Sequence, residues 1–287
     1  MADDSEQTRE DPARLSLSGV PETMLWPLWN RAAEMRRQDR LIEDPMAAGL
    51  VARITYDFAG RFGRPSVFHP IRARVSDDLI RAFLLRQPHK ASVVVLGEGL
   101  ETQFWRLGAP DVTWSSVDLP EAIAVRQRLL PHHPAVHHVA CSALDPAWMD
   151  AVPAVPAPFI SAAGLLMYFQ DEEVRTLLAR IATRFPGGEI FFDTITPPIS
   201  RRTQRGWQIT RHYTAPPMPW GIAIDALPGF VGAIPGIELL SVQSYADPFP
   251  QRTRLYSLLS RIGPLRRRFA GGLVHLRIKD APGNRAG

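Results

Sequence analysis

The stretch Ala91 to Leu107, ASVVVLGEGLETQFWRL, decides the fold of this chain. An apolar run breaks at Gly97 and Gly99, and the chain then continues with helical spacing. Glycine permits a sharp turn and a close approach of the backbone to a ligand, and the first N–H groups of the following helix are free to bind it. The pattern predicts a strand, a ligand-binding turn and a helix. The motif alone is weak, because Thr102 stands where an NAD-binding turn normally has its third glycine.

Asp118 strengthens this interpretation, since it follows Gly97 by 21 residues and ends the next expected strand. A doubly wound fold places there the acid that binds the ribose hydroxyls of a cofactor. The alternative role for Asp118 is to cap a helix that begins near Pro120. S-adenosylmethionine fits better than NAD, because it has no pyrophosphate and therefore does not require a complete glycine loop. Its carboxylate needs a cation, for which Arg72 and Arg74 are candidates, but residues two apart on a helix do not share a face.

Strand-like and helical segments alternate after Ala91, which is typical of βαβ units and a mostly parallel sheet. Asp171 is expected to be the N-cap of the clearest helix, which begins after it, and Pro186 and two glycines are expected to end that helix. The expected strands cover 91–97, 112–118, 136–141, 158–169, 188–195, 237–245 and 271–278.

The whole chain divides into six expected parts. They are a disordered tail at 1–14, a helical N-terminal cap at 15–88, a cofactor-binding core at 89–195, a lid insertion at 196–236, C-terminal strands that complete the core at 237–280, and a tail at 281–287.

Composition excludes several classes of protein. Cys141 is the only cysteine, so an internal disulfide or a thiolate-rich metal site is excluded, and the histidine spacing indicates no metal site either. The net charge is +4, but no aromatic residues interleave with the basic clusters, which argues against a nucleic-acid partner. No apolar run has the length of a membrane span, and the acidic start is unlike a secretory signal. A cytoplasmic protein, monomeric or homodimeric, is expected.

Four segments in this order resemble the leucine carboxyl methyltransferase family, in particular its bacterial tetracenomycin-type polyketide O-methyltransferases. They are VVVLGEGLETQFWRL, VDLPEAIAVRQRLLP, CSALDPAWMD and GLLMYFQDEEVRTLLARIATRFPGGEIFFDTI, and shorter matches extend the resemblance over most of residues 19 to 195. The resemblance implies a class I methyltransferase fold: an α/β, Rossmann-like, doubly wound sheet with an antiparallel last strand, a helical N-terminal cap and a lid insertion. It also implies S-adenosylmethionine as cofactor and S-adenosylhomocysteine as product.

The resemblance also implies roles for individual residues. Arg74 matches the arginine that holds the methionine carboxylate, although Arg72 remains an alternative. Gly97 and Gly99 match the cofactor loop, and Asp118 with Leu119 match the ribose-binding acid and its neighbour. The adenine site is matched by Ser142, Ala143 and Leu144, with Ser142 in place of an acid. Ala163 stands where the family has a glutamate.

Methyl transfer from a sulfonium requires mainly alignment, and a base is needed only for an acceptor that is not yet ionised. His69 and His212 are candidate bases, and each has packing or surface exposure as its alternative role. Tyr168 is expected to face the crevice and orient the acceptor, unless it belongs to the core.

A small hydrophobic acceptor is expected because aromatic and apolar side chains gather in the cap and the lid. The expected pocket residues are Met24, Trp26, Tyr213 and Trp220, with Trp29, Trp207, Met218 and Phe230 as further candidates. The leading hypothesis is an O-methyltransferase acting on a carboxylate or hydroxyl of a polyketide-like molecule. The alternatives are methylation of a protein C-terminal carboxylate, or a cofactor-binding module without catalysis.

Overall fold

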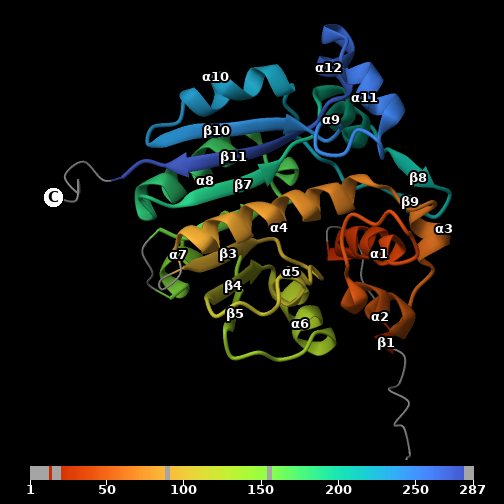
Figure 1. Cartoon of the computed structure of the whole chain (residues 1–287), viewed down its shortest axis with the longest axis horizontal. Helices are drawn as coiled ribbons and strands as arrows, with labels where there is room; N and C mark the ends of the chain where they lie inside the picture. Colours follow the sequence, from red (N-terminus) through yellow and green to blue (C-terminus); the bar gives the residue numbers. More distant parts are fainter. Residues whose placement is uncertain (1–12, 15–20, 88–90, 154–156, 281–287) are drawn as a thin grey trace, which may run out of the picture.

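The computed structural model describes residues 13–14, 21–87, 91–153 and 157–280 (Figure 1). The two expected tails lie almost wholly outside these ranges. A seven-stranded sheet forms the centre, in the order β10-β11-β7-β6-β3-β4-β5. Its strands are β3 (Ser92–Leu96), β4 (Thr113–Asp118), β5 (Val136–Ala140), β6 (Phe159–Ala162), β7 (Glu189–Asp193), β10 (Ile237–Ser244) and β11 (Gly272–Ile278).

The sheet is doubly wound about β3. Chain order runs outward from β3 through β4 to β5, then returns to the other side of β3 with β6 and β7, and these neighbours pair in parallel. β11 pairs antiparallel with both β7 and β10. The expected Rossmann-like class I methyltransferase fold with an antiparallel last strand is confirmed, and the carboxyl ends of β3 and β4 form the crevice in which such folds bind ligands.

Helices cover both faces of the sheet, as Figure 1 shows for α4 in front and α8 behind. Side chains alternate along a strand, so Val93 and Val95 pack with α4 while Val94 and Leu96 pack with α8 and α10. The covering helices are α4 (Phe68–Arg86), α5 (Gln103–Arg106), α6 (Pro120–Leu129), α7 (Trp148–Ala151), α8 (Asp171–Arg184) and α10 (Leu227–Gly232). The cap expected at 15–88 therefore contains one helix, α4, that packs on the central sheet.

Two expected boundaries are wrong. The strand expected over 158–169 ends at Ala162, because the chain turns at Gly164 with φ +76° and forms the short helix η2 (Leu166–Tyr168). Gln170, rather than Asp171, is the N-cap of α8; the Glu173 carboxylate accepts the Gln170 backbone N–H at 2.7 Å. Glutamate at this position satisfies a donor that the first turn leaves free.

The remaining N-terminal elements precede α4. They are β1 (Ala13–Arg14), η1 (Pro21–Met24), α1 (Leu25–Glu34), α2 (Pro45–Arg53), β2 (Ile54–Thr55) and α3 (Phe58–Phe62). Of these, α1, α2, β2 and α3 pack in a second, N-terminal core that also contains Leu100, Leu129 and Leu130. Tyr213 from the distant 196–236 segment packs into this core edge-on against both Trp26 and Phe62.

The 196–236 segment has regular elements on both sides of an irregular stretch at 215–223. It contains α9 (Pro197–Gln204), β8 (Gln208–Thr210), β9 (Tyr213–Thr214), η3 (Ile224–Ala226) and α10. The hairpin of β8 and β9 reaches α3, where the Thr210 hydroxyl lies 2.8 Å from the carbonyl oxygens of Gly60 and Arg61. The segment thus has one half packed on the sheet and the other on the N-terminal core.

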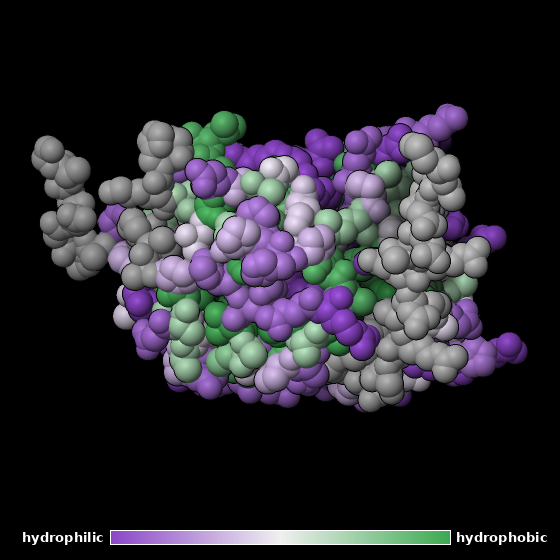
Figure 2. All heavy atoms as spheres, turned by 90° about the horizontal axis from the view of Figure 1, so that it is seen from below, coloured by the Kyte–Doolittle hydropathy of each residue, from purple (hydrophilic) through white to green (hydrophobic). Residues whose placement is uncertain are grey.

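The C-terminal strands are separated by α11 (Arg254–Ser260) and α12 (Gly263–Phe269), and α12 has Pro264 in its first turn. Figure 2 shows the molecule from below relative to Figure 1, where hydrophilic side chains cover most of the surface and apolar areas lie between them. No helix of the described residues is long and apolar enough to cross a membrane.

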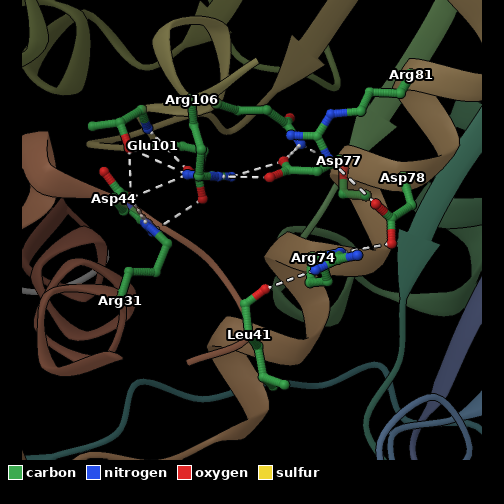
Figure 3. A network of polar contacts seen from close by, with 12 residues as sticks. Arg31, Leu41, Asp44, Arg74, Asp77, Asp78, Arg81, Glu101 and Arg106 are labelled. Carbon is green, nitrogen blue, oxygen red and sulfur yellow. Dashed lines mark hydrogen bonds and ion pairs between the residues drawn. The ribbon is translucent and has the colours of Figure 1, made fainter. Parts of the chain in front are cut away.

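A buried network of charges fastens the N-terminal elements to the turn after β3 (Figure 3). Arg106 binds both oxygens of Asp77 at 2.7 and 2.9 Å, Asp44 at 3.1 Å and Glu101 at 2.7 Å. Arg31 binds Asp44 and Glu101, each at 3.0 Å. Burial opposes ionisation of Glu101, but Arg106 and Arg31 outweigh it and lower the pKa of this carboxyl to about 2.

Arg106→Leu is expected to destabilise the fold by about 3 to 5 kcal/mol, because three buried carboxylates lose their shared cation. Urea unfolding followed by tryptophan fluorescence measures this change. Arg81→Ala is the control, since the ion pair of Arg81 with Asp78 is exposed and its loss should cost no more than about 1 kcal/mol. Equal effects of the two substitutions would contradict the assigned role of Arg106.

The network also predicts a pH dependence. The pKa of Glu101 is lower in the folded chain than the ordinary 4.5, so its stabilising contribution is complete above pH 4.5 and is lost as the pH falls toward 2. The free energies of unfolding of wild type and Glu101→Gln should therefore differ at neutral pH and converge in this window. A constant difference down to pH 2 would rule out the lowered pKa.

Candidate active site

The turn between β3 and α5 has the conformation that its glycines predict. Gly97 has φ +66° and Gly99 has φ +50°, a region that side chains with a Cβ rarely adopt. A Cβ on Gly97 would lie 2.8 Å from Leu165 Cδ1, and one on Gly99 would lie 2.8 Å from Met24 Cβ. The two glycines therefore let the turn pack closely against Met24 and Leu165. These four residues line one pocket next to the carboxyl end of β3.

Asp118 closes the turn from the end of β4. One carboxylate oxygen accepts the Gly99 N–H at 2.7 Å, and the other accepts the Leu119 N–H at 2.8 Å. Burial raises the pKa of Asp118, while these two N–H groups act against the shift. Each oxygen keeps lone-pair capacity for a further donor such as a ribose hydroxyl. Asp118 therefore fixes the turn and lines the pocket. The alternative role as a helix cap is wrong, because α6 has Leu119 as its N-cap and no side-chain cap hydrogen bond.

The residues expected around the adenine lie on the neighbouring strand end. Cys141, directly after β5, donates its backbone N–H to the Asp118 carbonyl at 2.8 Å, which places Ser142 beside the same edge of the sheet. Ser142 caps its own loop by accepting the Leu144 N–H at 3.2 Å, and the Ala143 carbonyl accepts the Trp148 indole N–H at 3.0 Å. These three residues do not line the described pocket.

Arg72 is the arginine that the structure brings to the pocket. Its guanidinium lies 3.2 Å from Asp193 at the end of β7, close enough to Gly164 that only glycine fits there. Asp193 also accepts the Tyr245 hydroxyl at 2.6 Å and the Gly164 N–H at 2.5 Å. Burial alone would lower the pKa of Arg72, but the Asp193 carboxylate outweighs it and raises the pKa.

Arg74 does not reach the pocket, which corrects the position carried over from the family. Figure 3 shows its side chain directed to Asp78 and to the Leu41 carbonyl, at 2.8 and 3.1 Å. The reason is helical geometry, because residues two apart on α4 point in different directions. Arg72 faces the sheet end, and Arg74 faces solvent.

Apolar and aromatic side chains line the part of the pocket next to Arg72. Met24, Trp26, Tyr168 and Met218 lie there, together with His69. Burial raises the pKa of Tyr168, so this phenol stays protonated at neutral pH and can orient a ligand but not remove its proton. The Trp26 indole N–H is buried and has no hydrogen-bond partner among the described residues.

His69 lies within the first turn of α4, three residues before Arg72. Its Nδ1 contacts the side-chain amide of Asn30, and its ring meets Trp26 edge-on with centroids 5.6 Å apart. Burial, together with the positive charges of Arg72 and Arg31, lowers the pKa of His69 well below its ordinary value. The imidazole is therefore neutral at neutral pH.

Three expected site residues lie elsewhere. His212 is exposed at the tip of the β8–β9 hairpin, where its ring nitrogen accepts from Arg211 at 2.8 Å. Trp220 packs on Phe192 and Phe230 in the sheet core, and its indole N–H reaches Asp171 at 3.0 Å. Tyr213 stands behind Trp26 and supports it without lining the pocket. Aromatic composition alone cannot separate residues that line a pocket from those that pack behind it.

The sequence interpretation missed several contributors to the site. Arg31 and Glu101 line the pocket from the network described above, and Asp193 with Tyr245 holds Arg72. The sequence offered only a weak indication that these residues belong to the site. Asp193 ends β7, but Tyr245 follows β10, which lies at the edge of the sheet. Within the described ranges, no three His, Cys, Asp or Glu side chains are grouped so as to hold a metal ion.

Comparison with solved structures finds methyltransferases of low sequence identity. Solved structures with similar folds include the N-methyltransferase NodS of Bradyrhizobium japonicum WM9 in complex with S-adenosyl-l-homocysteine, which is 12% identical with a TM-score of 0.45 over 88% of this chain and 98% of that one. The plantazolicin methyltransferase BpumL is 10% identical with a TM-score of 0.47, over 90% and 97% of the two chains. These structures are related in fold only.

Sequence relatives are more similar. The tetracenomycin polyketide synthesis O-methyltransferase TcmP of Streptomyces glaucescens is 32% identical over 242 residues, which cover 82% of this chain and 87% of that protein. The S-adenosyl-L-methionine-dependent methyltransferase dpfgK of Gibberella zeae is 29% identical over 64% and 68% of the two chains. The model of the leucine carboxyl methyltransferase family matches residues 25–182, from α1 to near the end of α8. Because this family model covers more than half of the chain and TcmP is similar over most of it, the chain belongs to the leucine carboxyl methyltransferase family.

Proposed function

We propose that this methyltransferase transfers the methyl group of S-adenosylmethionine to an oxygen atom of a small hydrophobic or aromatic molecule. The observation that carries the proposal is a single pocket with two chemically different parts. Gly97, Gly99 and Asp118 contribute a polar turn and a carboxylate, Trp26 and Tyr168 contribute aromatic walls, and Arg72 lines the same pocket.

The residues present fit this cofactor. The Asp118 carboxylate is held by two backbone N–H groups and has capacity for the ribose hydroxyls. The Arg72 guanidinium is held from one side by Asp193 and is the cation suited to the methionine carboxylate. When bound, S-adenosylmethionine supplies an electrophilic methyl group on a positively charged sulfur.

The protein's own contribution is binding and alignment. An in-line displacement needs the acceptor oxygen fixed in place, and rigid aromatic walls achieve this at a low entropic cost. Trp26 is held by Phe62, stacked at 5.8 Å, and by Tyr213. The Trp26 indole N–H and the protonated Tyr168 hydroxyl are donors that can orient that oxygen.

The relation to TcmP supports a polyketide-like acceptor. A protein C-terminal carboxylate, the second candidate, is favoured by the family's description. It would need an open groove, whereas Met24, Trp26 and Met218 surround the site with bulky apolar side chains. Carboxylate and hydroxyl acceptors are both compatible with these walls.

Calorimetric titration with S-adenosylmethionine, S-adenosylhomocysteine and NAD tests the cofactor. Binding of the first two ligands without binding of NAD is expected. Transfer of a labelled methyl group is then measured to aromatic carboxylic acids, to phenols and to peptides with a free C-terminus. Transfer confined to the peptides would overturn the small-molecule proposal.

Arg72→Ala is expected to weaken S-adenosylhomocysteine binding by about 10- to 100-fold, because a charge-assisted hydrogen bond contributes about 1.5 to 3 kcal/mol. Arg74→Ala, two residues away on the same helix, is the matched control and should bind like wild type. Calorimetry measures both affinities. Loss of affinity in Arg74→Ala alone would reverse the assignment.

Asp118→Ala is likewise expected to weaken cofactor binding by at least about 10-fold, since it removes the acceptor for the ribose and loosens the Gly99 turn. Asp111→Ala, at an exposed position in the loop before β4, provides the control. Unchanged affinity in Asp118→Ala, measured on protein with wild-type unfolding behaviour, would exclude Asp118 from the site.

A further inference from the structure

Asn30 and His69 form a buried pair whose hydrogen-bond directions can be worked out. Asn30 lies in α1 with 1% of its surface exposed, and its Oδ1 accepts the Ser66 backbone N–H at 3.0 Å. A backbone N–H can only donate, so this end of the amide must be the oxygen. The other end, the NH2 group, therefore faces His69 Nδ1.

The amide NH2 group has no lone pair to offer, so Nδ1 must be the acceptor in this contact. His69 is neutral because burial and the nearby Arg72 and Arg31 charges disfavour a second proton. A neutral imidazole carries one proton. Since Nδ1 carries no proton, the proton is on Nε2. His69 lines the pocket, and Nε2 is the ring nitrogen that Asn30 does not engage.

We propose that Asn30 is a positioning residue that locks His69 in the Nε2–H tautomer, so that His69 donates a hydrogen bond to the methyl acceptor and does not remove its proton. This deepens the proposed function and rests on it, because it assigns His69 to the acceptor oxygen of the same pocket. From the sequence, His69 is a candidate general base, which would accept a proton from the methyl acceptor. In this proposal His69 instead donates a hydrogen bond to that acceptor.

The surroundings of His69 favour an acceptor that is already an anion. The Trp26 indole N–H is a buried donor without a partner in the described chain, and its ring lies edge-on to that of His69. The carboxylate of Glu101, which also lines the pocket, is engaged by Arg31 and Arg106 and is not free to act as a base. The N–H donors of His69 and Trp26 stabilise an ionised oxygen and offer no lone pair for the proton of a neutral hydroxyl.

Nitrogen NMR of histidine-labelled protein, with and without S-adenosylhomocysteine, measures the tautomer directly. His69→Gln assigns the signals of His69. His133 is an internal reference, because its Nδ1 accepts the Ala135 N–H at 3.2 Å. A proton on His69 Nε2 is expected, and a proton on Nδ1 would overturn the proposal. The free protein gives this result even if the cofactor does not bind, so failure of the proposed function is seen separately.

Asn30→Asp is the matched variant. Aspartate keeps an oxygen for the Ser66 N–H but presents a second oxygen to His69, which requires a proton on Nδ1. The tautomer is expected to switch in this variant while His133 is unchanged. An Nε2–H signal that survives in folded Asn30→Asp would show that Asn30 does not set the tautomer. If the variant does not fold, the wild-type spectrum still decides.

Benzoate, titrated into the S-adenosylhomocysteine complex, tests the direction of the hydrogen bond, with benzyl alcohol as the neutral counterpart. Benzoate is expected to shift the Nε2–H proton at lower concentration than benzyl alcohol. His69→Gln, whose amide can replace the Nε2 donor, should keep affinity for benzoate within about 3-fold, and His69→Asn should lose about 10-fold. No benzoate-dependent shift, or equal losses in both variants, would overturn the proposal.

Discussion

The sharing of Arg31 and Arg106 among Asp44, Asp77 and Glu101 is the constraint on which the site depends. It joins α1, the start of α2 and α4 to the turn that follows β3. Burying five charges is favourable only when each has good partners, so the geometry is restricted to one arrangement. That arrangement sets the distance from the glycine turn to the wall formed by Met24 and Trp26. The two parts of the pocket are therefore held by electrostatics rather than by the sheet alone.

The fold could be predicted from the sequence because its signals are local. An apolar run indicated β3, two glycines indicated the turn after it, and an acid 21 residues after Gly97 indicated the end of the next strand. The structure places Gly97, Gly99 and Asp118 in one pocket. The choice between Arg72 and Arg74 could not be made in this way, because it depends on the rotation of α4 against the sheet. Arg72 meets Asp193, which is 121 residues away in sequence.

The acceptor part of the pocket was the least predictable region for the same reason. Trp26 comes from α1, Tyr168 from η2 and Met218 from the segment after β9. Trp220 and Tyr213 have the same composition signal as these residues but support the walls from behind. Burial decides between the two roles, and no local pattern encodes it. The role of His69 depends equally on a partner, Asn30, that lies 39 residues earlier.

The β8–β9 hairpin has one further consequence. Thr210 hydrogen-bonds to carbonyl oxygens of α3, and Tyr213 fills the N-terminal core against Trp26. The hairpin and the helices before α4 therefore share one interior, although about 150 residues separate them. In chimaeras between relatives, an exchange of residues 208–214 alone would leave unfilled space and unpaired carbonyls in the host. The hairpin and the helices before α4 therefore have to be exchanged together.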